Sequence, residues 1–63
     1  MTETEELRTA ILKAVRETPG LTAEDLAFIF GATPEVYKAI AYLEWVSGDV
    51  RRDPITMALY SRD

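Results

Sequence analysis

The N-terminal part of the chain carries apolar residues at the spacing of one face of an α-helix. These positions follow an i, i+3, i+4, i+7, i+8 pattern and are Leu7, Ala10, Ile11, Ala14 and Val15. Thr4 is a suitable N-cap, and Glu5 and Glu6 place negative charge at the positive end of the helix dipole. Pro19-Gly20 interrupts the pattern. We therefore expect a first helix from about Thr4 to Glu17.

A second helix is predicted to begin after Leu21, with Thr22 as its N-cap. Asp25 stands three residues later, which makes a capping box with aspartate in place of the usual glutamate. Gly31 is expected to end this helix, because glycine accepts the left-handed conformation of a tight helix exit. The apolar face is expected to consist of Leu26, Ile29 and Phe30.

A third helix follows almost at once. Thr33 is its expected N-cap, and Pro34 suits the first helical position because the missing amide hydrogen is not needed there. The helix is predicted to end near Ser47-Gly48. The residues expected to point inward are Val36, Ile40, Leu43 and Val46.

The last fifteen residues have no helical period and predict a β-hairpin. Residues 49–52 and 57–61 are the two expected strands, and Asp53-Pro54-Ile55-Thr56 forms the turn between them. Pro54 has no amide hydrogen to donate, which suits a turn better than a paired strand. Leu21 is expected to add a very short third strand.

Two helices joined by a short turn around Gly31 are typical of a helix-turn-helix, and the helix before them and the hairpin after them make a winged form. The chain resembles the winged helix-turn-helix superfamily, and within it the small stand-alone winged-helix proteins of unassigned function. The segments that carry the resemblance are Leu21-Thr22-Ala23-Glu24-Asp25-Leu26-Ala27, Gly31-Ala32-Thr33-Pro34-Glu35-Val36, Ala39-Ile40-Ala41-Tyr42-Leu43 and Gly48-Asp49-Val50.

The resemblance implies an α+β fold of three helices with a C-terminal hairpin wing, as one domain over residues 1–63. It also implies DNA binding, with the third helix in the major groove and the wing on the backbone. The alternative is an unrelated three-helix domain with a C-terminal tail.

The chain departs from the family pattern in one spacing. Val36 follows Gly31 after five residues, whereas the family has six between the turn glycine and the first buried valine of the recognition helix. Either Tyr37 takes the buried place or the turn is shorter, so the rotational setting of the third helix stays open.

Length and composition limit the functions open to the chain. Its 63 residues make one domain, and a domain this short is marginally stable unless it is stapled or self-associates. Cys and His both count 0, which excludes disulfides and the usual zinc, copper and haem ligands. The chain also lacks a glycine-rich phosphate loop and a spacing suited to a Ser or Thr nucleophile with a Lys base. We therefore expect no enzyme activity, no catalytic residue, no metal and no cofactor.

The chain is expected to be cytoplasmic and to have no membrane partner. Its longest uncharged run, Leu26 to Pro34, is far shorter than the roughly 20 residues that span a bilayer. The first six residues contain three acids and no base, whereas a signal peptide begins with basic and apolar residues.

The distribution of charge argues against strong DNA binding. The net charge is −4, and residues 18–47, which hold the helix-turn-helix, contain four acids and one base. The chain has no Asn or Gln, and Lys38 is the one basic residue of the third helix, so base readout is poorly supplied. We therefore predict weak binding to double-stranded DNA. Its expected contacts are Thr33, Lys38, Tyr42, Arg51 and Arg52, and the alternative for the two wing arginines is a solvated face.

The outward side of the third helix is aromatic. Tyr37, Ala41 and Trp45 recur at a spacing of four and share one stripe. Tyr and Trp are enriched at protein interfaces, so this stripe is a candidate protein interface, and Phe28 would extend it. The alternative is that Trp45 caps the edge of the core against the wing.

Two functions therefore stand side by side. The first is a small DNA-binding transcriptional regulator, acting as a homodimer. The second is a winged-helix module for protein–protein contact with little DNA affinity, which uses the aromatic face of the third helix. Self-association is expected in both cases, because a domain this short has more aromatic surface than one small core can hide.

Overall fold

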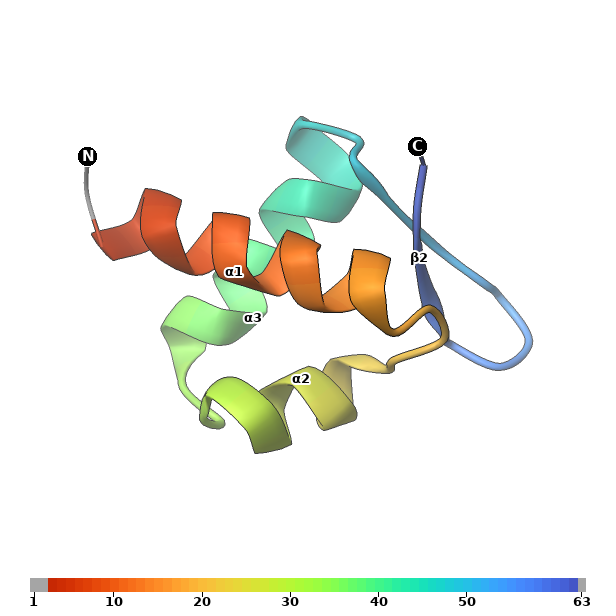
Figure 1. Cartoon of the computed structure of the whole chain (residues 1–63), viewed down its shortest axis with the longest axis horizontal. Helices are drawn as coiled ribbons and strands as arrows, with labels where there is room; N and C mark the ends of the chain where they lie inside the picture. The colour runs from red at the N-terminus through yellow and green to blue at the C-terminus, as the bar shows by residue number, and fades with distance from the viewer. Residues whose placement is uncertain (1–2, 63) are drawn as a thin grey trace.

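The chain folds into three helices followed by a two-stranded antiparallel hairpin, in the arrangement of a winged helix-turn-helix, so the predicted fold class is confirmed. The structure is a computed structural model that describes residues 3–62 (Figure 1). The elements are α1 (Glu3–Glu17), α2 (Ala23–Phe30), α3 (Pro34–Ala41), η1 (Tyr42–Val46), β1 (Val50–Arg52) and β2 (Leu59–Ser61). Of these, η1 is a single π-helical turn that continues α3.

Local capping explains where α2 and α3 begin. The Asp25 amide donates to Thr22 Oγ1 at 3.1 Å, and the Thr22 amide donates to Asp25 Oδ2 at 3.0 Å, which completes the predicted capping box. Thr33 accepts from the Val36 amide at 3.4 Å, with Pro34 at the first helical position. The prediction of Thr4 as the first N-cap is wrong, because α1 already includes Glu3.

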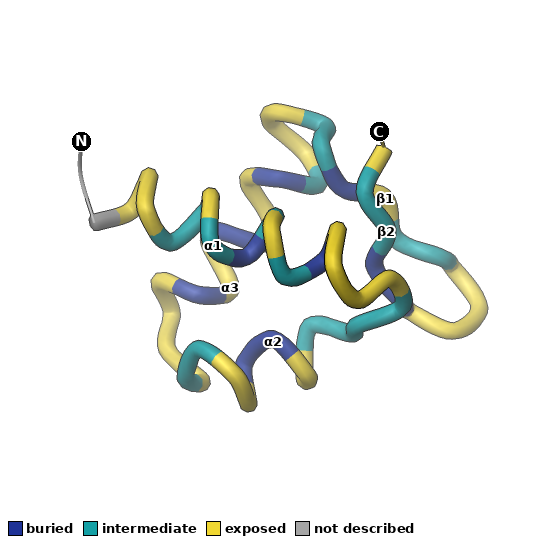
Figure 2. The backbone as a smooth tube through the Cα atoms, in the orientation of Figure 1, coloured by how far each residue is buried: buried dark blue, intermediate teal, exposed yellow. Residues whose placement is uncertain are grey.

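The core lies between α1, α3 and the hairpin, and α2 closes it from the side of α3. Its most deeply buried side chains come from every element except η1 and β1, and they are Ile11, Val15, Leu26, Val36 and Leu59. Figure 2 shows the buried stretches of α1, α2 and α3 facing one another across the molecule. α1 packs against both α3 and β2, which holds the hairpin beside the helices.

Two residues predicted to be in the core are exposed. Ile29 is 56% exposed because the buried face of α2 is rotated toward Ala27, whose small side chain is buried instead. Val46 is 70% exposed because a π-helical turn has more residues per turn than an α-helix, so each residue rotates less about the helix axis. Val46 therefore does not return to the inner side, while Ala39 is buried there.

The turn between α2 and α3 decides the setting of α3. Gly31 has φ 107° and ψ 143°, and its amide donates to the Ala27 carbonyl at 2.8 Å. Val36 is 1% exposed and Tyr37 is 47% exposed. The valine therefore keeps the buried place, and the turn is the shorter one.

The hairpin forms where it was predicted. β1 pairs with β2 in antiparallel register, with Val50 opposite Ser61 and Arg52 opposite Leu59. Leu21 makes a single bridge to Leu59, whose amide donates to the Leu21 carbonyl at 2.7 Å. The expected short third strand is thus one bridge long.

Candidate functional site

The outer side of α3 and η1 is left uncovered by the packing of the described chain. The inner side holds the buried residues Val36, Ala39, Ile40 and Leu43. The opposite side, which we call the α3 outer face, is exposed. It consists of Thr33, Glu35, Tyr37, Lys38, Ala41, Trp45 and Val46.

The aromatic stripe lies on this face as its spacing predicted. Tyr37, Ala41 and Trp45 are all exposed, and Trp45 is 79% exposed. The interpretation in which Trp45 caps the core edge against the wing is therefore wrong. Together with Val46, the stripe forms an apolar surface that no part of the described chain, residues 3–62, covers.

The π-helical turn keeps Trp45 in this stripe. The Ser47 amide donates to the Tyr42 carbonyl at 2.9 Å, five residues back. In a regular α-helix, positions four apart drift slowly around the axis, and a wider turn offsets that drift. The turn that moves Val46 out of the core thus also aligns Trp45 with Ala41 and Tyr37.

The two wing arginines have different environments. Side chains alternate along a strand, so adjacent residues project to opposite faces of the hairpin. Arg51 is exposed, while an Arg52 guanidinium nitrogen lies 2.9 Å from Glu44 Oε1. This ion pair holds β1 against η1 and compensates the charge of Arg52. Of the two arginines, Arg51 is the more exposed.

An aspartate beside Arg51 orders the wing turn. Asp53 Oδ1 accepts from the Ile55 amide at 2.8 Å and from the Thr56 amide at 3.2 Å. These hydrogen bonds, with a smaller contribution from the Arg51 charge, hold the pKa of the Asp53 carboxyl below its ordinary value of 3.8. The carboxylate is therefore ionised at neutral pH and offsets part of the positive potential of the wing.

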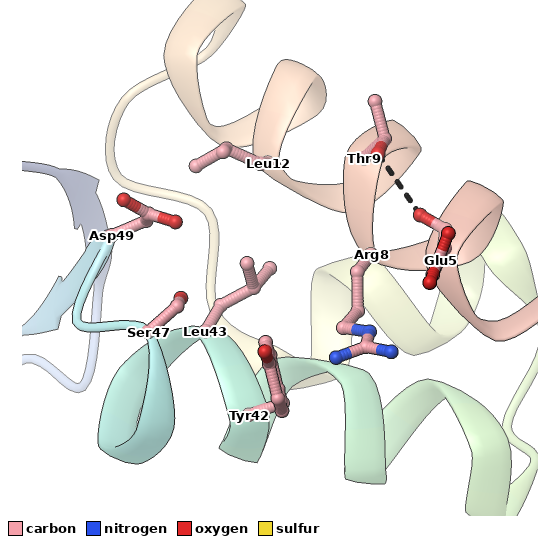
Figure 3. A pocket seen from close by; sticks show the side chains of 8 residues that line it. All are labelled: Glu5, Arg8, Thr9, Leu12, Tyr42, Leu43, Ser47 and Asp49. Carbon is pink, nitrogen blue, oxygen red and sulfur yellow. Dashed lines mark hydrogen bonds between the residues drawn. The ribbon is translucent and has the colours of Figure 1, made fainter. Parts of the chain in front are cut away.

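Tyr42 lies apart from the other predicted DNA contacts. The Arg8 guanidinium from α1 stacks on its ring at 3.8 Å from the ring centre (Figure 3). The ring therefore faces the α1 side of the helix and not the stripe. It lines an open hollow of about 420 Å³ together with Glu5, Arg8, Thr9, Leu12, Leu43, Ser47 and Asp49. These side chains mix both charges and have no common chemistry.

Of the predicted DNA contacts, Thr33, Lys38, Tyr42 and Arg51 are exposed, and Arg52 is partly buried. Thr33 Oγ1 is occupied by the cap of α3, Lys38 stands on the α3 outer face, and Arg51 is on the wing. Glu35 lies three residues before Lys38 in the same helix and is also exposed. The face therefore combines one lysine and one glutamate with an apolar stripe.

Other exposed apolar residues belong to α2 and to the wing. Phe28 is 92% exposed on α2, and Ile55 and Met57 are exposed at the wing tip. Met57 also has φ 64°, which is unusual for a residue other than glycine. The sequence does not predict the apolar character of the wing tip, because a Pro-containing turn indicates exposed backbone but not which side chains are exposed with it. A second hollow of about 390 Å³ lies between this wing and the start of α2, where Thr22, Ala23 and Glu24 meet Arg52, Thr56 and Met57.

Within residues 3–62, no group of acidic side chains is arranged to hold a metal ion. In the same range, no helix has the length and apolar character needed to cross a bilayer. The chain matches no protein-family model, no curated protein and no solved structure.

Proposed function

We propose that the chain is a small DNA-binding transcriptional regulator that binds duplex DNA weakly and with little sequence preference. The observation that supports this is the exposed outer side of α3 beside a hairpin wing. In a winged helix this geometry allows a helix to enter the major groove while the wing lies along the backbone. Lys38 and Arg51 are the side chains assigned to phosphate contact.

The charges explain why the affinity is expected to be low. Phosphate neutralisation supplies most of the free energy of non-specific DNA binding. Arg52 is already paired with Glu44, and Arg51 stands beside the ionised Asp53. Few positive charges then remain for the phosphates, and base readout would depend on Lys38 with no Asn or Gln in the chain.

The test is a titration of two unrelated duplexes of equal length, between about 20 and 200 mM salt. Lys38→Ala and Arg51→Ala should each reduce the slope of log affinity against log salt by about 0.9. Arg52→Ala should reduce it less, because Glu44 already compensates that charge. Lys13→Ala, an exposed lysine of α1, is the matched control and should change nothing.

Two outcomes would contradict this function. Nanomolar affinity for one of the duplexes at about 150 mM salt would mean that the face reads bases after all. No binding of either duplex at the lowest salt would remove DNA as a partner.

The second candidate function is protein–protein contact with little DNA affinity. The observation that favours it is the exposure of Trp45 and Val46 in one apolar surface on α3 and η1. Exposed surfaces of this kind mark interaction sites more often than isolated apolar residues do. Absence of a salt-dependent DNA complex, together with a Trp45-dependent protein complex, would select this function.

A further inference from the structure

The stripe on the α3 outer face is arranged symmetrically about Ala41. Tyr37 lies four residues before Ala41, and Trp45 lies four residues after it, and all three are exposed. The centre of the stripe is thus a small side chain with an aromatic on each side.

A helix face with this symmetry is complementary to a second copy of itself in antiparallel orientation. A twofold axis through Ala41 would set Tyr37 of each copy against Trp45 of the other. Ala41 would meet its own counterpart, where its small size lets the helix axes approach to about 8–10 Å. Twofold dimers use the same patch on both subunits, so they require this kind of self-complementarity.

We propose that a second copy of this chain covers the α3 outer face, in an antiparallel α3–α3 dimer centred on Ala41.

The size of the surface fits a weak, reversible dimer. Tyr37, Trp45 and Val46 are 47%, 79% and 70% exposed, which leaves on the order of 400 Å² of mostly apolar side chain on one patch. A stable interface of standard size buries about 800 Å² per partner, so the apolar centre supplies about half and polar neighbours supply the rest. Trp45 is a tryptophan, one of the residue types that dominate the binding energy of such interfaces.

The charges fit the same arrangement. Glu35 lies near the start of α3, so an antiparallel pair places it at the rim of the contact. Lys38 lies three residues before Ala41 and beside the stripe, where the partner covers it in part. Two copies still bring together a net charge of −4 each, and this repulsion weakens association at low salt. Added salt therefore strengthens the dimer, whereas it weakens DNA binding.

The dimer has a consequence for the function proposed above. It covers Lys38 and the side of α3 assigned to the major groove, so association and DNA binding exclude each other. This competition rests on the proposed DNA-binding function, while the dimer itself does not.

Cross-linking tests the dimer directly because the chain has no cysteine of its own. At an axis separation of about 8–10 Å, the Cα atoms of two facing residues fall within the range that a disulfide needs. We expect Ala41→Cys to form a disulfide-linked dimer rapidly on mild oxidation. Lys38→Cys, on the same face, should link slowly, because its counterpart lies roughly 9 Å further along an antiparallel partner. Lys13→Cys, at an exposed position of α1 on the other side of the core, is the matched control and should also link slowly.

Sedimentation equilibrium supplies the second measurement, on the chain without cysteine. Over roughly 10–500 µM the mass should rise from 7.1 kDa toward twice that value. Trp45→Ala should weaken association about 30-fold or more, and Lys13→Ala, at an exposed position of α1 on the other side of the core, should leave it unchanged. Trp45 is so exposed that its removal leaves the core intact.

The outcomes separate this inference from the DNA-binding function. A 7.1 kDa species at all concentrations, or Ala41→Cys linking no faster than Lys13→Cys, overturns the dimer whatever the DNA result. Equal rates for Lys38→Cys and Ala41→Cys overturn the antiparallel arrangement. Rapid linking of Ala41→Cys without any DNA binding supports the dimer and removes the regulator function. Where duplex DNA binds, it should slow the linking of Ala41→Cys, and unchanged linking would overturn the competition.

Discussion

Gly31 fixes the exit from α2 through one backbone conformation. Its φ of 107° with ψ of 143° lies in a region that is essentially restricted to glycine. A Cβ at this position would meet only Thr33 Cγ2 at 3.8 Å, which is an ordinary contact. The requirement for glycine is therefore a property of the backbone and not of the space around it.

Gly31→Ala should lower the free energy of unfolding by about 1–3 kcal/mol through backbone strain. For a domain of this size, each kcal/mol corresponds to roughly 4–8 °C in Tm, so thermal unfolding followed by circular dichroism will resolve the change. Ala32→Gly in the same turn is the control, because it changes chain entropy by only about 0.5–1 kcal/mol. Equal effects of the two changes would mean that the turn does not need its glycine.

Gly20, in the loop between α1 and α2, is also held in one backbone conformation. It has φ 99°, and its amide donates to the Leu59 carbonyl at 3.1 Å. Gly20 thus joins the loop between α1 and α2 to the hairpin, and alanine at this position should also be destabilising.

At the scale of the elements, the starts of α2 and α3 were predictable from the sequence, whereas the buried faces of the helices were only partly predictable. Thr22 with Asp25, and Thr33 with Pro34, are local patterns whose hydrogen bonds lie within three residues. The burial of Val46 depends on a π-helical turn, for which the sequence carries no cap or spacing rule. The same limit applied to Ile29, which its apolar spacing places on the inner face of α2 and which the packing leaves 56% exposed.

In the candidate site too, features set by local spacing were predictable, whereas features set by tertiary packing were not. The stripe of Tyr37, Ala41 and Trp45 was predictable because its members lie on one helix at a fixed spacing. The stacking of Arg8 on Tyr42 joins residues far apart in the chain, so spacing alone could not reveal it. The pairing of Arg52 with Glu44 depends likewise on how β1 folds back against η1.

The wing turn should show its own pH dependence. Hydrogen bonds from the Ile55 and Thr56 amides, and secondarily the Arg51 charge, lower the pKa of Asp53 in the folded state. A carboxylate with a lowered folded pKa stabilises the fold above its unfolded pKa, about 4 for an aspartate, and loses that effect as the pH falls through the folded value. Asp53→Asn keeps an acceptor oxygen but does not titrate. Its Tm should therefore fall less than that of the unsubstituted chain between about pH 4 and pH 2.

Glu17→Gln is the matched control for this experiment, because it removes one exposed acid from the end of α1, away from the turn. It should leave the acid limb of the Tm curve close to that of the unsubstituted chain. If Asp53→Asn and Glu17→Gln flatten the curve equally, the wing turn has no special part in the pH dependence.

At the scale of the whole molecule, the core is small for the apolar surface that the sequence supplies. The buried residues form one cluster shared by α1, α2, α3 and the hairpin. Large apolar side chains nevertheless remain exposed on α2, on η1 and at the wing tip. A domain of 63 residues with no disulfide gains little stability from its core alone, so covering one of these surfaces has a large relative effect.

If the α3 outer face is covered by a second copy, stability must depend on concentration. Association of folded chains adds a free energy that grows with the ratio of chain concentration to Kd, about 2.7 kcal/mol at a hundredfold ratio for a simple ligand. Between roughly 5 and 500 µM, the Tm should therefore rise by several degrees. Trp45→Ala should abolish the rise, while Lys13→Ala, which changes an exposed side chain of α1 on the other side of the core, should preserve it. Added salt should increase Tm more at high than at low chain concentration, because it screens the repulsion between two chains of net charge −4. A Tm that is independent of concentration at every salt would show that the stability of the fold comes from a single chain.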